Sequence, residues 1–245
     1  MKQVLGCVRR ADEKFNMIEN GDKVCVGVSG GKDSLLLMYA LKLYQNFSKN
    51  HFDILAVTLD LGIEDIDYGP IMEFADRIDV EYKLIHTDIG KVVFEMREER
   101  SPCALCAKLR RGALNNAAVE NGCHKVALGH NRDDVIETFF LSLLYESRIN
   151  TFAPVTYLSR KDVTVIRPLV YLPEKNALAT AKRLSLPVLP PHCKIAGTTK
   201  REEAKQILKY LCKLVPDADS KILHAINETD QYGLWDKMRL KDEIN

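Results

Sequence analysis

Residues 28–34, Val-Ser-Gly-Gly-Lys-Asp-Ser, place two glycines, a lysine and a carboxylate where a phosphate could bind. An apolar run precedes this stretch and a helix-like segment follows it. Backbone N–H groups and the positive end of the helix dipole should therefore meet at one point, which favours an anion. A glycine turn without a ligand is the alternative for Ser-Gly-Gly alone, but the longer motif directly after a buried strand disfavours it.

The stretch differs in two places from the Walker A loop, which has four residues before its Gly-Lys pair and a hydroxyl after the lysine. Here three residues separate Gly27 from Gly31, and Asp33 follows Lys32 in place of the hydroxyl. A shorter loop makes a smaller cradle, and a carboxylate beside the lysine would repel phosphate unless a metal ion lay between them. The stretch therefore fits a metal–pyrophosphate site better than a Walker site.

Cys103 and Cys106 form a CxxC motif at the start of a helical segment, and Cys193 is a distant companion. Thiols at this spacing can hold zinc, form a redox disulfide or ligate an iron–sulfur cluster. His192 could supply a fourth zinc ligand, and CxxC alone favours zinc or redox roles over a cluster. The remaining cysteines are expected to be core or surface thiols: Cys7, Cys25, Cys123 and Cys212.

Asp133 and Asp134 follow Asn131 at the expected start of a helix. Carboxylates are favourable there because they oppose the helix dipole and cap N–H groups. Alternatively, they lie across from the phosphate loop at the carboxyl end of a strand, where open α/β sheets bind ligands. Either could then bind magnesium or assist proton transfer, and Asp134 is the stronger candidate. His130 could face the same cleft, although a histidine at a strand end is more often structural.

Apolar runs suited to buried strands alternate with helix-period segments. This alternation predicts a doubly wound parallel α/β sheet covered by helices. One further strand and a helix follow residue 150, then a proline-rich connection and two or three helices from Thr199. The expected strands are 23–28, 52–60, 80–88 and 125–130, and the expected helices are 34–47, 68–78, 104–121 and 132–146, with another helix at the N-terminus.

The composition is that of an ordinary globular protein, with 245 residues, 46% hydrophobic and 28% charged. No segment approaches the roughly 20 apolar residues that span a bilayer, and the N-terminus lacks the apolar centre of a signal peptide. We therefore expect a cytoplasmic protein without membrane contact. The net charge of +1 gives no global attraction to polyanions, so such a partner must be held by local patches.

The Ser-Gly-Gly-Lys-Asp-Ser motif resembles the PP-loop of the N-type ATP pyrophosphatases, which cleave ATP between its α- and β-phosphates and transfer AMP to a substrate oxygen. The resemblance implies the adenine nucleotide alpha hydrolase fold. It also implies that the loop cradles pyrophosphate, that Lys32 neutralises it and that Asp33 helps to hold Mg2+. The positions implied for nucleotide binding are Val28, Ser29, Gly30, Gly31, Lys32, Asp33, Ser34, Val57, Leu59, Gly129 and Asp134.

The segments Cys103-Ala-Leu-Cys106-Ala-Lys-Leu-Arg-Arg-Gly112 and Ala127-Leu-Gly-His-Asn-Arg-Asp-Asp134 are similar to the tRNA 2-thiocytidine synthetase family. The similarity runs from about residue 21 to residue 201 and includes Ile166-Arg-Pro-Leu169. In that family three cysteines bind a 4Fe-4S cluster and leave one iron open. Better-known members have a cysteine pair near residue 193, whereas this chain has Cys193 alone, which still completes three thiolates with Cys103 and Cys106.

The family resemblance implies an ATP-dependent tRNA sulfurtransferase that converts a pyrimidine, most simply cytidine, to its 2-thio form in the anticodon loop. The C2 oxygen is a poor leaving group until AMP is attached to it, after which sulfide can replace it. Catalytic roles are implied for Lys32, Asp33, Asp134 and Arg111. The implied partners are tRNA and a sulfur donor, either a cysteine desulfurase or inorganic sulfide, and a homodimer is expected.

Two other functions fit part of the pattern. Lysidine synthesis also adenylates a tRNA cytidine at C2, but its nucleophile is lysine and it needs no cysteine triad. An ATP-binding iron–sulfur or zinc sensor would keep the fold without the transfer reaction. We expect an N-terminal helix over 1–20, a PP-loop domain over 21–190, and a helical extension over 191–245 that carries the third cysteine.

A basic stripe recurs at four-residue spacing on the expected helix after Thr199, beside an apolar face at Ala204, Ile207, Leu208 and Leu211. Such a stripe is usually a solvated face. With basic residues near the CxxC motif it could instead contact tRNA phosphates, and the two alternatives are about equal. The stripe is Arg201, Lys205, Lys209 and Lys213, and the basic residues near the motif are Arg97, Arg100, Lys108, Arg110 and Arg111.

Overall fold

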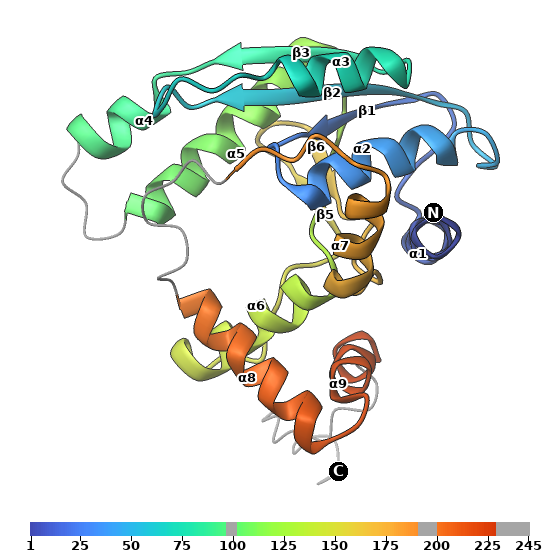
Figure 1. Cartoon of the computed structure of the whole chain (residues 1–245), viewed down its shortest axis with the longest axis vertical. Helices are drawn as coiled ribbons and strands as arrows, with labels where there is room; N and C mark the ends of the chain where they lie inside the picture. The colour runs from blue at the N-terminus through green and yellow to red at the C-terminus, as the bar shows by residue number, and fades with distance from the viewer. Residues whose placement is uncertain (97–101, 191–199, 229–245) are drawn as a thin grey trace, which may run out of the picture.

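The structure is a computed structural model, and it describes residues 1–96, 102–190 and 200–228. The strands of this part form one sheet in the order β3-β2-β1-β4-β6-β5 (Figure 1). All neighbouring pairs are parallel except β5 with β6, which is antiparallel. The strands are β1 (Asp22–Gly27), β2 (Phe52–Asp60), β3 (Glu81–His86), β4 (Lys125–Ala127), β5 (Val155–Leu158) and β6 (Val163–Ile166). The predicted parallel α/β architecture is confirmed.

The central strands are buried on both faces, which explains their continuous apolar runs. In β1, Val24 and Val26 face one hydrophobic cluster, whereas Cys25 faces another. Leu55 and Val57 of β2 join Cys25 in the second cluster. Because the strands are parallel, the loops after their carboxyl ends gather at one edge of the sheet, where open α/β sheets bind ligands.

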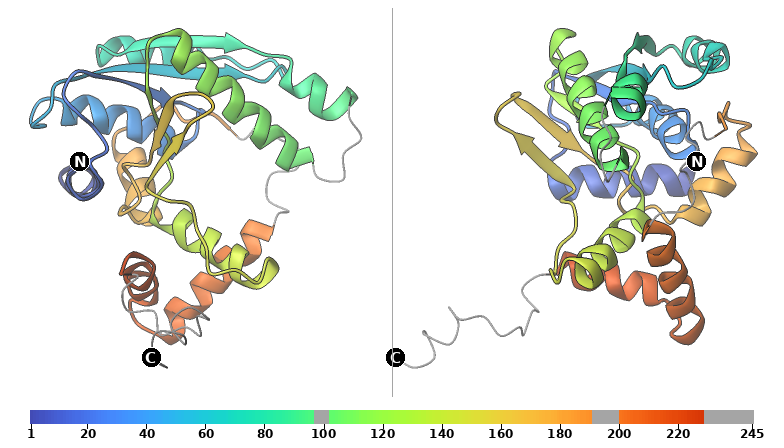
Figure 2. Two further views of the ribbon diagram at one scale, coloured as in Figure 1. Left: turned by 180° about the vertical axis from the view of Figure 1, so that it is seen from behind. Right: turned by 90° about the vertical axis from the view of Figure 1, so that its left-hand side faces the viewer.

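Helices cover the two faces unequally, as the two views in Figure 2 show. On one face, α2, α3 and α7 contribute to the larger hydrophobic cluster, and α1 packs against α2. On the other face, α5 packs through Leu114, Ala117 and Ala118. The helices are α1 (Lys2–Phe15), α2 (Lys32–Tyr44), α3 (Gly69–Arg77) and α7 (Glu174–Arg183) on the first face and α5 (Pro102–Glu120) on the second.

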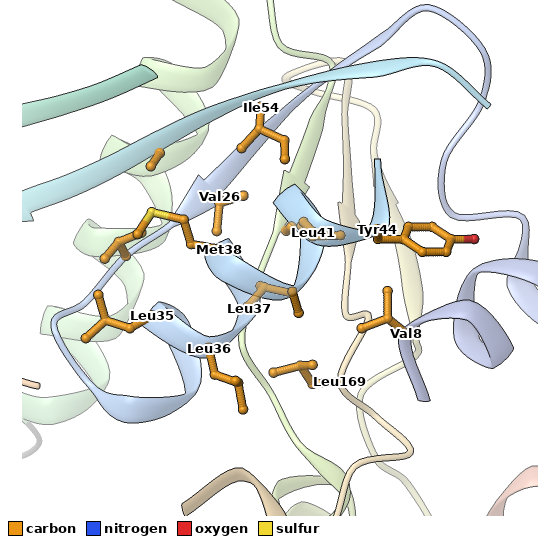
Figure 3. Packing of buried hydrophobic residues seen from close by; sticks show 14 of the residues in the cluster. Val8, Val26, Leu35, Leu36, Leu37, Met38, Leu41, Tyr44, Ile54 and Leu169 are labelled. Carbon is orange, nitrogen blue, oxygen red and sulfur yellow. The ribbon is translucent and has the colours of Figure 1, made fainter. Parts of the chain in front are cut away.

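The helix α2, which begins at the phosphate loop, is apolar around most of its circumference. Figure 3 shows Leu36 and Leu37 on the side of Leu169, Leu41 on the side of the strands, and Tyr44 beside Val8 of α1. Leu35, Leu36, Leu37 and Leu41 are each 0% exposed. A helix with so many buried leucines cannot shift without opening the core, so its N-terminal end holds the loop in a defined place.

A smaller helical cluster lies beyond the carboxyl edge of the sheet, at the bottom of Figure 1. There α6 (Arg132–Tyr145) packs against α8 (Lys200–Leu214) and α9 (Ala218–Asn227). The predicted apolar face of α8 is confirmed, since Ala204 and Leu208 are buried against α6. No helix in the described ranges is long and apolar enough to cross a membrane.

Two elements were not predicted. The strand β5 is a short, partly exposed edge strand in a hairpin with β6, so it lacks the continuous apolar run that marked the central strands. The segment after β3 contains α4 (Ile89–Lys91) and a π-helical turn, η1 (Val92–Met96). Such turns carry no sequence periodicity, because packing rather than propensity determines them. The strand β4 is also shorter than the predicted 125–130.

Replacement of a leucine in the buried helix should weaken the whole fold. Leu37→Ala should lower the free energy of unfolding by about 2–5 kcal/mol, because the cavity in α2 cannot be filled by its neighbours. Leu178→Ala on α7 is the matched control, because Leu178 is 41% exposed and its loss should cost about 0.5 kcal/mol or less. Urea unfolding of both variants measures the difference. Equal destabilisation would contradict the central role of α2.

Candidate active site

The phosphate loop is closed by its own serines. The N–H of Ser29 donates to the Ser34 hydroxyl over 3.1 Å, and that hydroxyl donates to the Gly31 carbonyl over 2.9 Å. Gly31 is the N-cap of α2, with no side chain covering the first N–H groups of the helix. Gly30 has a φ of +80°, and a Cβ there would lie 3.0 Å from Leu189. The loop is therefore a shaped cradle with N–H donors, as the motif predicted.

Gly129 brings the loop after β4 against the phosphate loop. A Cβ at this position would lie 2.9 Å from the carbonyl carbon of Asp33 and 3.0 Å from the nitrogen of Ser34. Backbone cannot yield as a flexible side chain can, so any larger residue would push the two loops apart. The sequence named Gly129 only by resemblance; the structure shows the close approach that requires a glycine.

Lys32 and Asp33 form a charged pair beside the loop. The Nζ of Lys32 donates to Asp33 Oδ2 over 2.7 Å and to Glu174 Oε1 over 3.2 Å. Burial opposes the charge on Lys32, but these two carboxylates outweigh it and raise its pKa. Burial also raises the pKa of Asp33, and its Oδ1 is buried without a hydrogen-bond partner. An oxygen in that condition is suited to a hard cation such as Mg2+.

Asp133 and Asp134 have separate roles in the structure. Asp134 forms a capping box with Asn131, and its Oδ1 accepts from Arg201 Nη1 over 2.9 Å. Asp133 Oδ2 accepts the backbone N–H of Glu174 over 2.7 Å and so caps α7. The capping explanation therefore holds for both, while only Asp134 lines the pocket with Asp33.

Opposite the phosphate loop is a polar pocket of about 180 Å3. Its carboxylate oxygens are the ligand type that Mg2+ prefers. Glu137 lies one turn after Asp134 and is 4% exposed. Burial, with the charge of Asp134 next in size, raises the pKa of Glu137 to about 7. The lining residues are Asp33, Asn131, Asp134, Glu137, Glu174, Arg201, Glu202 and Lys205.

Several of these pocket residues were missed by sequence reasoning. Glu174 was assigned only to a helix, and Arg201 and Lys205 were assigned to a solvated face or to tRNA. Their signal in the sequence is weak, because Glu174 lies 142 positions after its partner Lys32. Glu137 could have been noticed, since spacing of three residues from Asp134 puts both on one helix face.

The predicted adenine contacts lie at the end of β2. The carbonyl of Val57 accepts the N–H of Val28 over 2.8 Å, so it continues the sheet into the phosphate loop. Leu59 lies two residues further along, opposite Ile85 of β3 in the parallel register. Adenine binding at these two positions stays a prediction.

The CxxC cysteines lie on the first turns of α5. Cys103 is exposed and Cys106 is partly buried, and the spacing of three residues puts them on one helix face. Their predicted companion Cys193, like His192, Arg97 and Arg100, lies outside the described residues. Within the described ranges no group of three potential ligands could hold a metal ion. Two soft thiols suit zinc or an iron–sulfur cluster equally, so this pair alone does not choose between them.

The other cysteines fit the expectation of core and surface thiols. Cys25 and Cys123 are buried, Cys7 is partly buried and Cys212 is exposed. Burial raises the pKa of Cys25 to about 12, so its thiol is protonated and unreactive.

His130, Phe152 and Arg167 form a cluster after β4 and beside β6. The His130 ring is 4.9 Å from the Phe152 ring, and the Arg167 guanidinium is 4.9 Å from the same ring. The His130 Nδ1 and the Arg167 Nε are both buried without hydrogen-bond partners. Within the described residues the Arg167 side chain donates to two neutral oxygens, the Ala153 carbonyl and the Thr156 hydroxyl.

The electrostatics of His130 connect the pocket to the cysteine helix. Burial lowers the pKa of His130 to about 4, so the ring is neutral at physiological pH. Arg167, then Arg201 of the pocket and Arg111 of α5, add to that shift. Burial and then Arg111 lower the pKa of Arg167 to about 10. The charges that act on His130 therefore come from the pocket and from α5, which sequence reasoning did not foresee.

Comparison with known proteins agrees with this geometry. Residues 6–187 match the family described as the PP-loop domain. The tRNA-cytidine(32) 2-sulfurtransferase of Anaeromyxobacter dehalogenans (strain 2CP-C) is 33% identical over 240 residues, which are 96% of this chain and 82% of that protein. The protein of the same name from Alkalilimnicola ehrlichii is 36% identical over 235 residues, 94% of this chain and 74% of that protein.

Solved structures also resemble the chain. The U34-tRNA thiolase NcsA from Methanococcus maripaludis, solved with its 4Fe-4S cluster, superimposes with a TM-score of 0.78 at 26% identity, over 96% of this chain and 80% of that one. The NH3-dependent NAD synthetase from Campylobacter jejuni gives a TM-score of 0.50 at 17% identity, over 96% of this chain and 97% of that one, and shares the fold alone.

The buried Glu137 predicts a pH-dependent stability. Its folded pKa of about 7 is above the unfolded value of 4.5, so ionisation of the unfolded chain lowers stability as pH rises through this window. Glu137→Gln removes that loss. Without Mg2+, the variant should match the wild type near pH 4.5 and exceed it by about 2–3 kcal/mol at pH 8. Urea unfolding at both pH values measures this, and equal stabilities at pH 8 would contradict it.

Proposed function

The chain belongs to the PP-loop family and, within it, to the tRNA-cytidine 2-sulfurtransferases, and from this premise we propose how its residues divide the reaction. The function is ATP-dependent thiolation of tRNA: AMP is attached to the C2 oxygen of a cytidine, pyrophosphate leaves, and sulfur replaces the activated oxygen. The position that we propose is cytidine 32 of the anticodon loop, which the names of the relatives carry.

One observation carries the proposal. The chain carries both a polar pocket lined by Asp33 and Asp134 and a helix that begins with Cys103 and Cys106, and charged residues of both parts, Arg201 and Arg111, act on His130. Thiolation at C2 needs such an arrangement, because the same carbon must first meet ATP and then a sulfur source. Lysidine synthesis needs only the first site, and a sensor needs no substrate position between them.

The first step takes place at the phosphate loop. The C2 carbonyl oxygen of cytidine attacks the α-phosphorus of ATP, an O–P bond forms, and the bond to the β-phosphate oxygen breaks. The N–H groups of the cradle and Lys32 stabilise the charge on the departing pyrophosphate. Asp33 and Asp134 would hold Mg2+, which supplies further neutralisation of that charge when bound. The orphaned Asp33 oxygen supports this assignment.

The second step takes place on the side of α5. Sulfide forms a bond to C2, the bond from C2 to the adenylate oxygen breaks, and AMP leaves with that electron pair, while the sulfur loses its proton. Cys103, Cys106 and Cys193 would hold the 4Fe-4S cluster, which supplies a binding point for sulfur. Two exposed or partly buried thiols at the start of one helix fit this role. The sulfur donor that we propose is a cysteine desulfurase or inorganic sulfide.

We place the target base beside Phe152 and Arg167. A pyrimidine has a flat apolar face that suits an aromatic neighbour, and a carbonyl oxygen that suits a guanidinium. Neutral His130 adds an uncharged hydrogen-bonding edge. Arg111, on α5, is suited to polarise the base or to contact its phosphate. An unpaired loop nucleotide can turn out of its stack into this position at lower cost than a paired one.

The remaining assignments are part of the same proposal. We divide the chain into an N-terminal helix over 1–20, a PP-loop domain over 21–190 and an extension over 191–245 that carries the third cysteine. We also propose a homodimer in the cytoplasm, where tRNA is the substrate. Sedimentation of the purified protein measures the assembly state directly.

Thiolation should need both sites, and each can be removed alone. Lys32→Ala should lower tRNA-dependent pyrophosphate release by about 100-fold or more, because the departing charge is no longer neutralised. Cys103→Ser should abolish 2-thiocytidine formation while pyrophosphate release continues. Cys212→Ser is the matched control, since Cys212 is exposed on α8. The assays are pyrophosphate release and mass spectrometry of tRNA nucleosides, with the protein purified anaerobically.

The same assays, with Cys103→Ala as a further variant, separate the alternatives. A protein without iron and sulfide that modifies tRNA equally well after Cys103→Ala would contradict thiolation and favour a lysidine-type transfer. ATP binding without tRNA-dependent pyrophosphate release would favour a sensor. Loss of 2-thiocytidine from the tRNA of cells lacking the gene would support the proposal.

The base position predicts a selective loss of tRNA use. Phe152→Ala and Arg167→Gln should each lower kcat/KM for tRNA by about 10–100-fold, because the base is no longer held, while ATP affinity in the absence of tRNA stays within about twofold. Arg160→Gln, at the exposed turn between β5 and β6, should change neither. Equal losses of ATP affinity and of kcat/KM for tRNA would show that Phe152 and Arg167 have a structural role rather than a base-binding one.

A further inference from the structure

The basic stripe of α8 is divided by the fold into two halves. Arg201 and Lys205 point into the polar pocket, where both contact carboxylates. Lys209 and Lys213 are exposed, and within the described residues they form no ion pair. The four residues of the stripe share one spacing and one charge, but they have two different surroundings. Arg201 and Lys205, which face the pocket, are therefore not part of an ordinary solvated helix face.

The hydrophobic side of α8 determines which half faces the pocket. Ala204 and Leu208 are buried against Ile136 and Phe140 of α6. Figure 1 shows α8 lying across α6, and the Arg201 side chain reaches back along α6 to Thr138 and to Asp134 in its first turn. Arg201 and Lys205, at the start of α8, are thereby held beside the phosphate loop, while Lys209 and Lys213 extend away from it.

The pocket-facing cations are bound by acids that ATP and Mg2+ would also engage. Arg201 Nη1 lies 2.9 Å from Asp134 Oδ1. Lys205 Nζ lies 2.7 Å from Glu174 Oε2, and Glu174 is shared with Lys32 of the phosphate loop. Lys205, Glu174 and Lys32 therefore form one chain of alternating charges from α8 to the loop, and the pair of Arg201 with Asp134 lies separately in the same pocket.

The charge balance of the pocket favours an exchange of partners. Five lining residues are acidic, Asp33, Asp134, Glu137, Glu174 and Glu202, so a polyphosphate would be repelled unless cations turn toward it. A divalent cation at Asp33 and Asp134 competes with Arg201 for the same Asp134 oxygen. The Arg201 side chain is 45% exposed, and ion pairs of such exposure are weak, so the exchange costs little. The released guanidinium stays beside the phosphates.

We propose that Arg201 and Lys205 bind the pyrophosphate portion of ATP, and that α8 thus completes the nucleotide site from the C-terminal extension. This inference rests on the proposed function, since it takes ATP to be the ligand of the phosphate loop. Guanidinium and ammonium groups both bind phosphate through charge-assisted hydrogen bonds. Asp134 and Glu174 hold the two side chains in place before ATP binds, and the two cations then exchange these carboxylates for phosphate oxygens.

Single charge removals along the stripe test the proposal. Arg201→Gln and Lys205→Gln should each weaken binding of a non-hydrolysable Mg2+–ATP analogue, and of inorganic pyrophosphate with Mg2+, by about tenfold. Lys209→Gln and Lys213→Gln are the matched controls on the same helix, and should stay within about twofold. Calorimetric titration of the full chain without tRNA measures all four. Arg201→Lys, which keeps the charge, should restore most of the affinity.

Other outcomes would overturn the proposal. Wild-type affinity for both ligands in Arg201→Gln and Lys205→Gln, with only tRNA binding reduced, would assign the pair to tRNA phosphates. Equal weakening by all four variants would indicate a long-range charge effect. Thermal unfolding checks that each variant is folded, and Arg201→Ala or Lys205→Ala removes the same charge if the glutamine variant does not fold. A wild type that binds ATP but releases no pyrophosphate with tRNA would refute thiolation and leave this test valid.

Discussion

The approach of Gly129 to the backbone of Asp33 is the contact on which the site depends. With no space for a Cβ between them, the loop after β4 and the start of α2 are in direct backbone contact. That contact brings Asp134 into the same pocket as Asp33, although 101 positions separate them in sequence. The parallel sheet makes it possible, because the strands β1 and β4 are hydrogen-bonded neighbours whose carboxyl ends point the same way. The apolar helix α2 then keeps the phosphate loop from moving away.

The charges around this contact form a balanced set rather than a row of independent pairs. Lys32 is shared by Asp33 and Glu174, and Glu174 is shared by Lys32 and Lys205. When a bound ligand takes one of these carboxylates as its partner, the cation that was paired with the carboxylate becomes available to the ligand. Glu137 is the member with least compensation, because it is nearly buried and 3.9 Å from Arg201, and its raised pKa follows. Pockets of this kind trade stability for function, since their charges are arranged for a ligand.

The phosphate loop and the cysteine pair both belong to the carboxyl edge of the sheet, but they are carried by helices on its two different faces. The helix α2 leads the phosphate loop from one face, and α5 carries the cysteine pair on the other. The cluster of His130, Phe152 and Arg167 lies after β4 and beside β6. Its buried nitrogens without partners are costly in a folded protein, which is the reason to assign them to a substrate.

The sequence by itself determined the local parts: the alternating strands and helices, the phosphate loop, the CxxC pair, and the capping motif that precedes Asp134. Each of these depends on residues within one turn or one strand of each other, where propensity and spacing decide the structure. Only the tertiary structure decided that Asp133 caps α7, that Glu174 links Lys32 to Lys205, and that Arg201 differs from Lys213. Spacing along α8 is the same for all members of its basic stripe. The surroundings of the four residues differ because the packing of Ala204 and Leu208 against α6 fixes the position of each turn of α8. A long-range contact of that kind leaves no periodic signal in the sequence.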